Sequence, residues 1–166
     1  LDLGWLCLYV PVRLIYVRPP EGPAAKVTAD TSSFTIKVKP MFPVSIKGVL
    51  LVDDGKVVLV MNDRDEWELP GGRIEMGEES TICVQREFEE ELGITVTASK
   101  LLDAYLFEVL PGKHVFIVTY GCRLQSPFVP RLSHEHKQFG TFPVAALPAR
   151  LPSGYKASIE AWHAAA

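Results

Sequence analysis

The segment from Gly72 to Ile94 constrains this chain most, because it places a glycine-rich loop directly before a helix-forming stretch crowded with carboxylates. It reads Gly-Arg-Ile-Glu-Met-Gly-Glu-Glu-Ser-Thr-Ile-Cys-Val-Gln-Arg-Glu-Phe-Glu-Glu-Glu-Leu-Gly-Ile. In a helix of roughly 3.6 residues per turn, Glu87, Glu90 and Glu91 are spaced i, i+3 and i+4, so their side chains converge on one edge. Three such acids repel one another unless a cation shares them or some take up protons. The segment therefore predicts a divalent-metal site.

Carboxylate oxygens are hard ligands, and they select Mg2+, with Mn2+ as the other candidate. The predicted helix starts at Gly77 and Glu78, where an acid meets the positive end of the dipole, and ends at Gly93 as a left-handed terminator. We expect an apolar stripe beside the acids to pack on a sheet. The stripe consists of Thr81, Val84, Phe88 and Leu92.

The segment resembles the Nudix box of the Nudix hydrolase family, G-x5-E-x7-R-E-U-x-E-E-x-G-U, in which U is aliphatic or aromatic. The fixed positions are filled by Gly72, Glu78, Arg86, Glu87, Glu90, Glu91 and Gly93, with Phe88 and Ile94 at the U sites. Most acidic runs merely solvate a helix surface, but a solvated surface does not require these glycines and this arginine at these offsets.

The resemblance implies an α/β fold, specifically a Nudix-type α/β/α sandwich with a mixed β-sheet. It implies metal ligation by Glu87, Glu90 and Glu91, to which the Gly72 carbonyl adds a further oxygen. It also implies an ion pair between Arg86 and Glu78 that braces the loop against the helix.

A second group of polar residues, Ser133-His134-Glu135-His136, lies between two predicted strands. Many Nudix proteins carry a Ser-x-Glu-His-like loop here whose glutamate approaches the metals. By that resemblance Glu135 is a candidate metal ligand or general base, alongside Glu87. The alternative is that Glu135 and the two histidines are ordinary surface residues of the loop.

Three residues near the box are candidates for contacting substrate. The loop at Gly71 allows backbone to approach a ligand closely. Trp67 has the ring to stack on a base or sugar, although aromatic residues beside strands more often belong to the core. Arg73 is a candidate phosphate contact, with an ordinary surface charge as its alternative.

The remaining pattern predicts strands before and after the box and a helix at the end of the chain, which together indicate a layered α/β domain. Asp53-Asp54-Gly55 and Pro111-Gly112-Lys113 separate the hairpin strands. The predicted strands are 34–38, 44–52, 56–61, 94–110, 114–124 and 138–142, with a helical turn at 144–147 and a helix at 153–165.

We assign residues 34–166 to the Nudix domain and residues 1–33 to an N-terminal extension of uncertain role. The chain begins with leucine, which suggests a fragment or a reading frame extended upstream of the true start. The apolar run 3–17 is interrupted by Pro11 and Arg13 and lacks a basic leader, so neither a signal peptide nor a membrane span is expected. The extension is also a candidate interface for a homodimer.

The net charge of −3 gives no broad basic surface, so we expect a nucleotide-sized ligand and no long nucleic acid as partner. The cysteines, Cys7, Cys83 and Cys122, are widely separated and suggest neither a zinc site nor a disulfide framework. A reduced, cytoplasmic location fits this pattern.

The resemblance implies a pyrophosphohydrolase in which metal ions bridge substrate phosphates and activate a water for in-line attack. The implied substrate is a nucleoside diphosphate linked to another group, either a nucleotide sugar such as ADP-ribose or a nucleoside triphosphate. Two alternatives remain, a non-catalytic nucleotide-sensing Nudix module and an RNA 5′-end pyrophosphohydrolase.

Overall fold

The computed structural model describes residues 25–29, 32–36, 41–53 and 55–165, and the chain divides into two compact units, Leu1–Met41 and Phe42–Ala166. In the described part of the first unit, β1 (Ala25–Ala29) and β2 (Ser32–Ile36) form an antiparallel pair. The strand expected at 34–38 is therefore present, but it starts two residues earlier. The predictions made for residues 1–24 lie outside the described residues.

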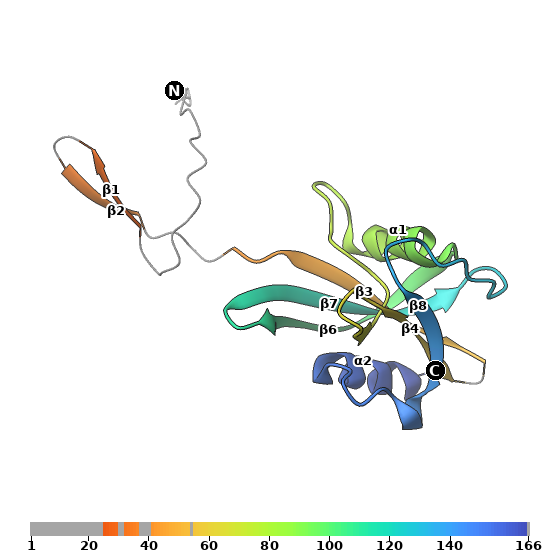
Figure 1. Ribbon diagram of the computed structural model, residues 1–166. Helices are drawn as coiled ribbons and strands as arrows, with labels where there is room; N and C mark the ends of the chain where they lie inside the picture. The colour runs from red at the N-terminus through yellow and green to blue at the C-terminus, as the bar shows by residue number, and fades with distance from the viewer. Residues whose placement is uncertain (1–24, 30–31, 37–40, 54, 166) are drawn as a thin grey trace, which may run out of the picture. The chain divides into compact units, whose positions relative to one another are not determined.

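The second unit contains a six-stranded sheet with helices on both faces (Figure 1). Its elements are β3 (Val44–Val52), β4 (Lys56–Met61), β5 (Trp67–Glu68), α1 (Ser80–Leu92), β6 (Val96–Leu110), β7 (Lys113–Leu124), β8 (Gln138–Pro143), the 3-10 turn η1 (Val144–Ala146) and α2 (Ser153–His163). The strand order is β5-β4-β3-β7-β6, with β8 paired to β4. Because β3 and β7 run parallel and the other pairs are antiparallel, the sheet is mixed as predicted.

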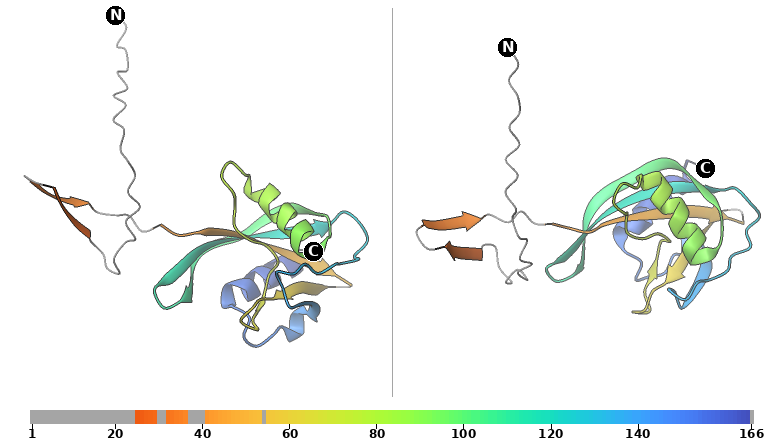
Figure 2. Two further views of the ribbon diagram at one scale, coloured as in Figure 1. Left: turned by 45° about the horizontal axis from the view of Figure 1, so that its top comes forward. Right: turned by 90° about the horizontal axis from the view of Figure 1, so that it is seen from above.

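Each face of the sheet is covered by one helix, and Figure 2 shows α1 and α2 on opposite sides. Along β4, Val58 and Val60 pack in the α1 layer, whereas Val57 and Leu59 pack in the α2 layer. Successive strand residues point to opposite faces, so a strand covered on both sides is apolar throughout. The predicted α/β/α sandwich is confirmed.

The stripe predicted on α1 faces the sheet, and Val84, Phe88 and Leu92 are fully buried. The helix begins at Ser80, later than predicted, because Gly77 has a φ of 83° and is outside the helical region. It ends as predicted at Gly93, whose φ of 62° is left-handed and whose N–H donates to Glu89 O. Among the described residues, no helix is both long and apolar enough to cross a membrane.

Candidate active site

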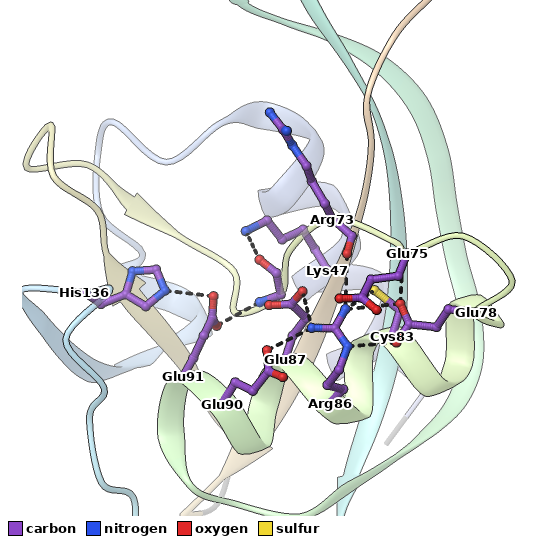
Figure 3. Close-up of polar contacts among 11 residues, drawn as sticks. Lys47, Arg73, Glu75, Glu78, Cys83, Arg86, Glu87, Glu90, Glu91 and His136 are labelled. Carbon is purple, nitrogen blue, oxygen red and sulfur yellow. Dashed lines mark hydrogen bonds and ion pairs between the residues drawn. The ribbon is translucent and has the colours of Figure 1, made fainter.

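The three acids of the box lie along one edge of α1, and their side chains extend toward the loop that contains Arg73 (Figure 3). Glu87 and Glu91 are 8% and 3% exposed, while the Glu90 side chain is 53% exposed. Burial raises the pKa of Glu87, because a carboxylate loses solvation there. The edge therefore combines one solvent-facing acid, Glu90, with two buried acids, Glu87 and Glu91.

Arg86 lies at the centre of this cluster and carries its counter-charge. Its Nε donates to Glu78 Oε1 at 2.8 Å, and its Nη1 donates to Glu87 Oε1 at 2.9 Å and to Glu90 Oε2 at 2.8 Å. Its Nη2 reaches the carbonyl of Arg73 at 3.2 Å. The ion pair predicted between Arg86 and Glu78 is present, and one guanidinium ties the loop to the acidic edge.

Glu78, in the loop before α1, is fixed by two kinds of donor. Besides Arg86, the backbone N–H of Glu75 donates to its Oε2 at 3.0 Å. Hydrogen bonding to Arg86 and to the Glu75 backbone lowers the pKa of Glu78 from 4.5 to about 2. The carboxylate is thus charged at neutral pH.

Replacing Glu78 by glutamine is expected to flatten the acid side of the stability profile. A carboxylate with a depressed folded pKa stabilises the fold above its unfolded pKa and loses that contribution as the pH falls through its folded pKa. The wild-type protein should therefore lose stability from about pH 4.5 toward about pH 2 more steeply than Glu78→Gln. Urea unfolding midpoints at about pH 6 and about pH 3 measure this difference. Glu79→Gln, at the exposed neighbouring acid, should keep the wild-type slope; an unchanged slope in Glu78→Gln would show that its carboxylate is not specially stabilised.

Both carboxylate oxygens of Glu91 have partners from outside α1. Oε2 accepts the backbone N–H of Gly71 at 2.9 Å, and Oε1 lies 2.8 Å from His136 Nε2. The hydrogen bond to Glu91 raises the pKa of His136. The sequence reasoning singled out the Ser133–His136 loop for Glu135, but the side chain that reaches the acidic edge is that of His136.

Lys47, on β3, is a buried residue that the sequence reasoning missed. It is 6% exposed, its Nζ donates to the carbonyl of Gly71, and it lies 3.8 Å from Glu68 Oε1. A lysine inside an apolar strand, between Ile46 and Gly48, is the signal that would have identified it. Both backbone polar groups of Gly71 therefore have side-chain partners. Lys47 bonds its carbonyl, and Glu91 accepts its N–H.

The other predicted residues occupy different environments. Glu135 is exposed, and its backbone N–H donates to Ser133 Oγ at 3.3 Å. Arg73 is also exposed, while Trp67 is half-buried and packs edge-to-face on Phe142 with ring centroids 4.7 Å apart. The side chains of Glu135 and Arg73 therefore face solvent, whereas Trp67 contributes partly to the core.

A cleft of about 370 Å³ opens beside the Gly71 loop, on the α2 side of the sheet. Its lining includes Lys47, Glu68 and Trp67. The side chain of Ile117, from β7, and that of Tyr155, from α2, complete an apolar wall. Ligand sites typically combine an apolar wall with a few fixed polar groups in a volume of roughly 300–1,000 Å³. Lys47 connects this cleft to the acidic edge. It lines the cleft, and it bonds Gly71, whose N–H donates to Glu91 on the acidic edge.

The chemistry of the acidic edge fits a hard divalent cation. Glu87, Glu90 and Glu91 offer carboxylate oxygens, the ligands that such a cation prefers. A Cβ at Gly72 would lie 2.5 Å from both Glu87 oxygens, so the backbone and this carboxylate approach closely only because residue 72 is glycine. The Gly72 carbonyl already accepts the Ile46 N–H at 2.8 Å, which leaves one lone pair for another partner. Within the described residues, no three His, Cys, Asp or Glu side chains are arranged to hold a metal ion in this conformation.

Comparison with known proteins agrees with the fold and the acidic helix. A family model described as the NUDIX domain matches residues 41–162. A MutT-like protein from Streptomyces ambofaciens is 39% identical over 67 residues, covering 40% of this chain and 44% of the relative. An ADP-ribose pyrophosphatase from Bacillus subtilis (strain 168) is 34% identical over 85 residues, covering 45% of each chain. The matched segments thus span less than half the length of these curated relatives.

The solved structures extend the similarity over most of the second unit. The crystal structure of a MutT NUDIX hydrolase from Burkholderia pseudomallei is 27% identical with a TM-score of 0.61, and the alignment covers 73% of this chain and 98% of that chain. The family model includes the whole acidic segment, α1 and the cleft-lining strands. The protein therefore belongs to the Nudix family.

Proposed function

We propose that this protein hydrolyses the phosphoanhydride bond of a nucleoside diphosphate linked to a second group, with Mg2+ as cofactor and Mn2+ as a substitute. The observation that carries the proposal is the junction at Gly71, where the N–H bonds Glu91 on the acidic edge and the carbonyl bonds Lys47 in the cleft. A substrate whose diphosphate faces the acids would have its organic part beside a cleft of suitable size.

Glu87, Glu90 and Glu91, with the Gly72 carbonyl, are the residues that would hold the cation. A divalent ion bound there supplies charge neutralisation for the diphosphate and lowers the pKa of a water. Glu87 and Glu135 are the two candidates for accepting the proton of the attacking water. Both are carboxylates, which can accept a proton from a nearby water.

The remaining side chains of the site bind and orient. Arg86 keeps the Glu87 and Glu90 carboxylates in fixed directions through its Nη1. Lys47, which bonds the Gly71 carbonyl, and the exposed Arg73 would supply positive charge to a substrate diphosphate. Trp67 offers an aromatic surface for the nucleoside within the cleft.

We propose two substrate classes, nucleotide sugars such as ADP-ribose and nucleoside triphosphates. The name of the ADP-ribose pyrophosphatase relative supports the first class. Cleavage would give a nucleoside monophosphate with phosphorylated second group, or a nucleoside monophosphate with pyrophosphate.

The test is a panel of nucleoside diphosphate sugars, dinucleoside polyphosphates, nucleoside triphosphates and 5′-triphosphorylated RNA, incubated with Mg2+ or Mn2+ and analysed by mass spectrometry. We expect cation-dependent cleavage between phosphates of at least one small nucleotide. Saturable nucleotide binding without turnover would instead indicate a sensing module. Cleavage confined to RNA ends would indicate the RNA-processing alternative.

Shortening Trp67 to alanine is expected to raise KM for the best nucleotide about tenfold, because an aromatic contact of roughly 1–1.5 kcal/mol is lost. kcat should change much less, since the acidic edge is untouched. Trp67→Phe is the matched control, because it retains an aromatic ring against Phe142 and in the cleft. Steady-state kinetics at saturating Mg2+ measure both constants; an unchanged KM in Trp67→Ala would assign Trp67 to the core alone.

A further inference from the structure

We propose that His136 is a positioning residue that fixes the carboxylate of Glu91 for cation binding. The inference rests on the proposed function, because that function makes Glu91 a cation ligand. Glu91 lies near the end of α1, where a free side chain would rotate among several rotamers. The structure holds it from two directions, by Gly71 N–H at 2.9 Å and by His136 Nε2 at 2.8 Å.

This contact is buried, so water does not compete for it. The side chains of His136 and Glu91 are 7% and 4% exposed. For Nε2 to donate to the carboxylate, the ring must carry a proton on Nε2. The other ring nitrogen, Nδ1, is buried and has no hydrogen-bond partner within the described residues. Within the described chain, the hydrogen-bonding capacity of the ring is therefore directed to Glu91.

The backbone that carries His136 is attached to the same helix that carries Glu91. The N–H of Arg131 donates to Leu92 O at 2.7 Å, and the N–H of Ser133 donates to Glu91 O at 2.9 Å. The last carbonyls of a helix lack partners within the helix, and the loop satisfies two of them. The loop therefore acts as a cap on the last turn of α1.

Beyond His136, the loop is attached to the end of β4. The Lys137 N–H donates to Met61 O at 3.0 Å, and Lys137 Nζ reaches Asp63 O and Asp65 Oδ1, each at 2.8 Å. His136 thus lies between two anchored points, one on α1 and one at the β4–β5 turn. Its ring is placed by the fold itself, which is what a positioning residue requires.

The neighbouring His134 provides an internal comparison. It belongs to the same loop and has the same chemistry, but it is exposed, and Glu135 between them is exposed as well. The two histidines therefore distinguish an effect of the Glu91 contact from a general effect of altering the loop.

The experiment compares His136→Phe, which keeps a ring but removes the donor, with His134→Phe. We expect His136→Phe to weaken Mn2+ binding about 10- to 100-fold, the usual cost of losing a partner of a metal ligand. Electron paramagnetic resonance of free Mn2+, measured without nucleotide, gives this constant directly. In turnover assays the Mg2+ concentration for half-maximal rate should rise and kcat should fall, while the nucleotide KM at saturating Mg2+ changes less than about threefold. His134→Phe should match wild type in all of these.

Two further variants keep the test decisive if His136→Phe fails to fold. The amide nitrogen of Gln reaches the position of the imidazole Nε2, whereas that of Asn does not, so His136→Gln should retain near wild-type Mn2+ binding and His136→Asn should not. Equal Mn2+ binding by the Gln and Asn variants would overturn the proposal, as would wild-type Mn2+ binding in a folded His136→Phe.

The outcome is separable from that of the proposed function. If Glu91→Gln loses Mn2+ binding and turnover while His136→Phe keeps both, the positioning role is wrong and the hydrolase proposal stands. If wild-type protein cleaves no nucleotide, the hydrolase proposal fails, and Mn2+ binding by the histidine variants still decides the role of His136.

Discussion

Exchanging Glu90 or Glu91 for glutamine is expected to lower kcat on the order of 10²- to 10⁴-fold, because each change removes an anionic oxygen ligand worth several kcal/mol in the transition state. The two variants should differ in stability. Glu90 is half exposed, and replacing it removes only its contact with Arg86. Glu91 is buried, and replacing it removes the charged group that is hydrogen-bonded to Gly71 and to His136. Glu90→Gln should therefore retain the wild-type unfolding temperature more closely than Glu91→Gln.

Glu89→Gln is the matched control, because Glu89 is an exposed acid of the same helix directly beside Glu90. It should keep the wild-type kcat and the wild-type dependence on Mg2+. Circular dichroism of each variant checks the fold before rates are compared. Near wild-type rates in a folded Glu90→Gln or Glu91→Gln would remove that residue from the set of cation ligands.

The second large effect is expected from Gly71→Ala, which should lower the free energy of unfolding by roughly 2–5 kcal/mol. Gly71 has a φ of 127°, and an added Cβ would run into the backbone carbonyl of Ile46 and lie 2.9 Å from the Cα of Lys47. Neither atom belongs to a flexible side chain, so the loop itself must move. Moving it would also break the bonds from Gly71 to Glu91 and to Lys47, and activity should fall with stability.

Gly77→Ala separates strain from collision in this prediction. Gly77 also has a positive φ, 83°, but an added Cβ would meet nothing within 4 Å. Gly77→Ala should therefore lower the free energy of unfolding by roughly 1–2 kcal/mol, from backbone strain alone. Urea unfolding gives both values, and a Gly71→Ala loss no greater than that of Gly77→Ala would mean that the loop yields freely to the added methyl.

The predictable part of the fold depends on local patterns. The strands β3 and β4 were predicted with the bounds that the structure has, because apolar β-rich runs flank Asp53-Asp54-Gly55. The acids of α1 share an edge because helical spacing alone determines it. The helix start was placed too early, because Gly77 and Glu78 act in the preceding loop, where Glu78 bonds Arg86 and the Glu75 backbone.

Lys47 and His136 were not predicted as site residues, and the reason is the same for both. Lys47 is 24 residues from Gly71 in sequence, and His136 is 45 residues from Glu91. Contacts of that range are set by the strand order and by the anchoring of the loop after β7, which no local spacing reveals. The Ser-x-Glu-His pattern drew attention to the right loop, but its exposed glutamate stays a proposal while its histidine makes the buried contact.

Anomalous diffraction from crystals soaked in Mn2+ with a non-hydrolysable nucleotide tests the cation site most directly. We predict peaks at the edge of α1, with the oxygens of Glu87, Glu90 and Glu91 at bonding distances of about 2.0–2.4 Å and the nucleotide phosphates on the opposite side of the ions. Peaks elsewhere, or a nucleotide bound with these three carboxylates still directed only at Arg86, Gly71 and His136, would contradict the assignment.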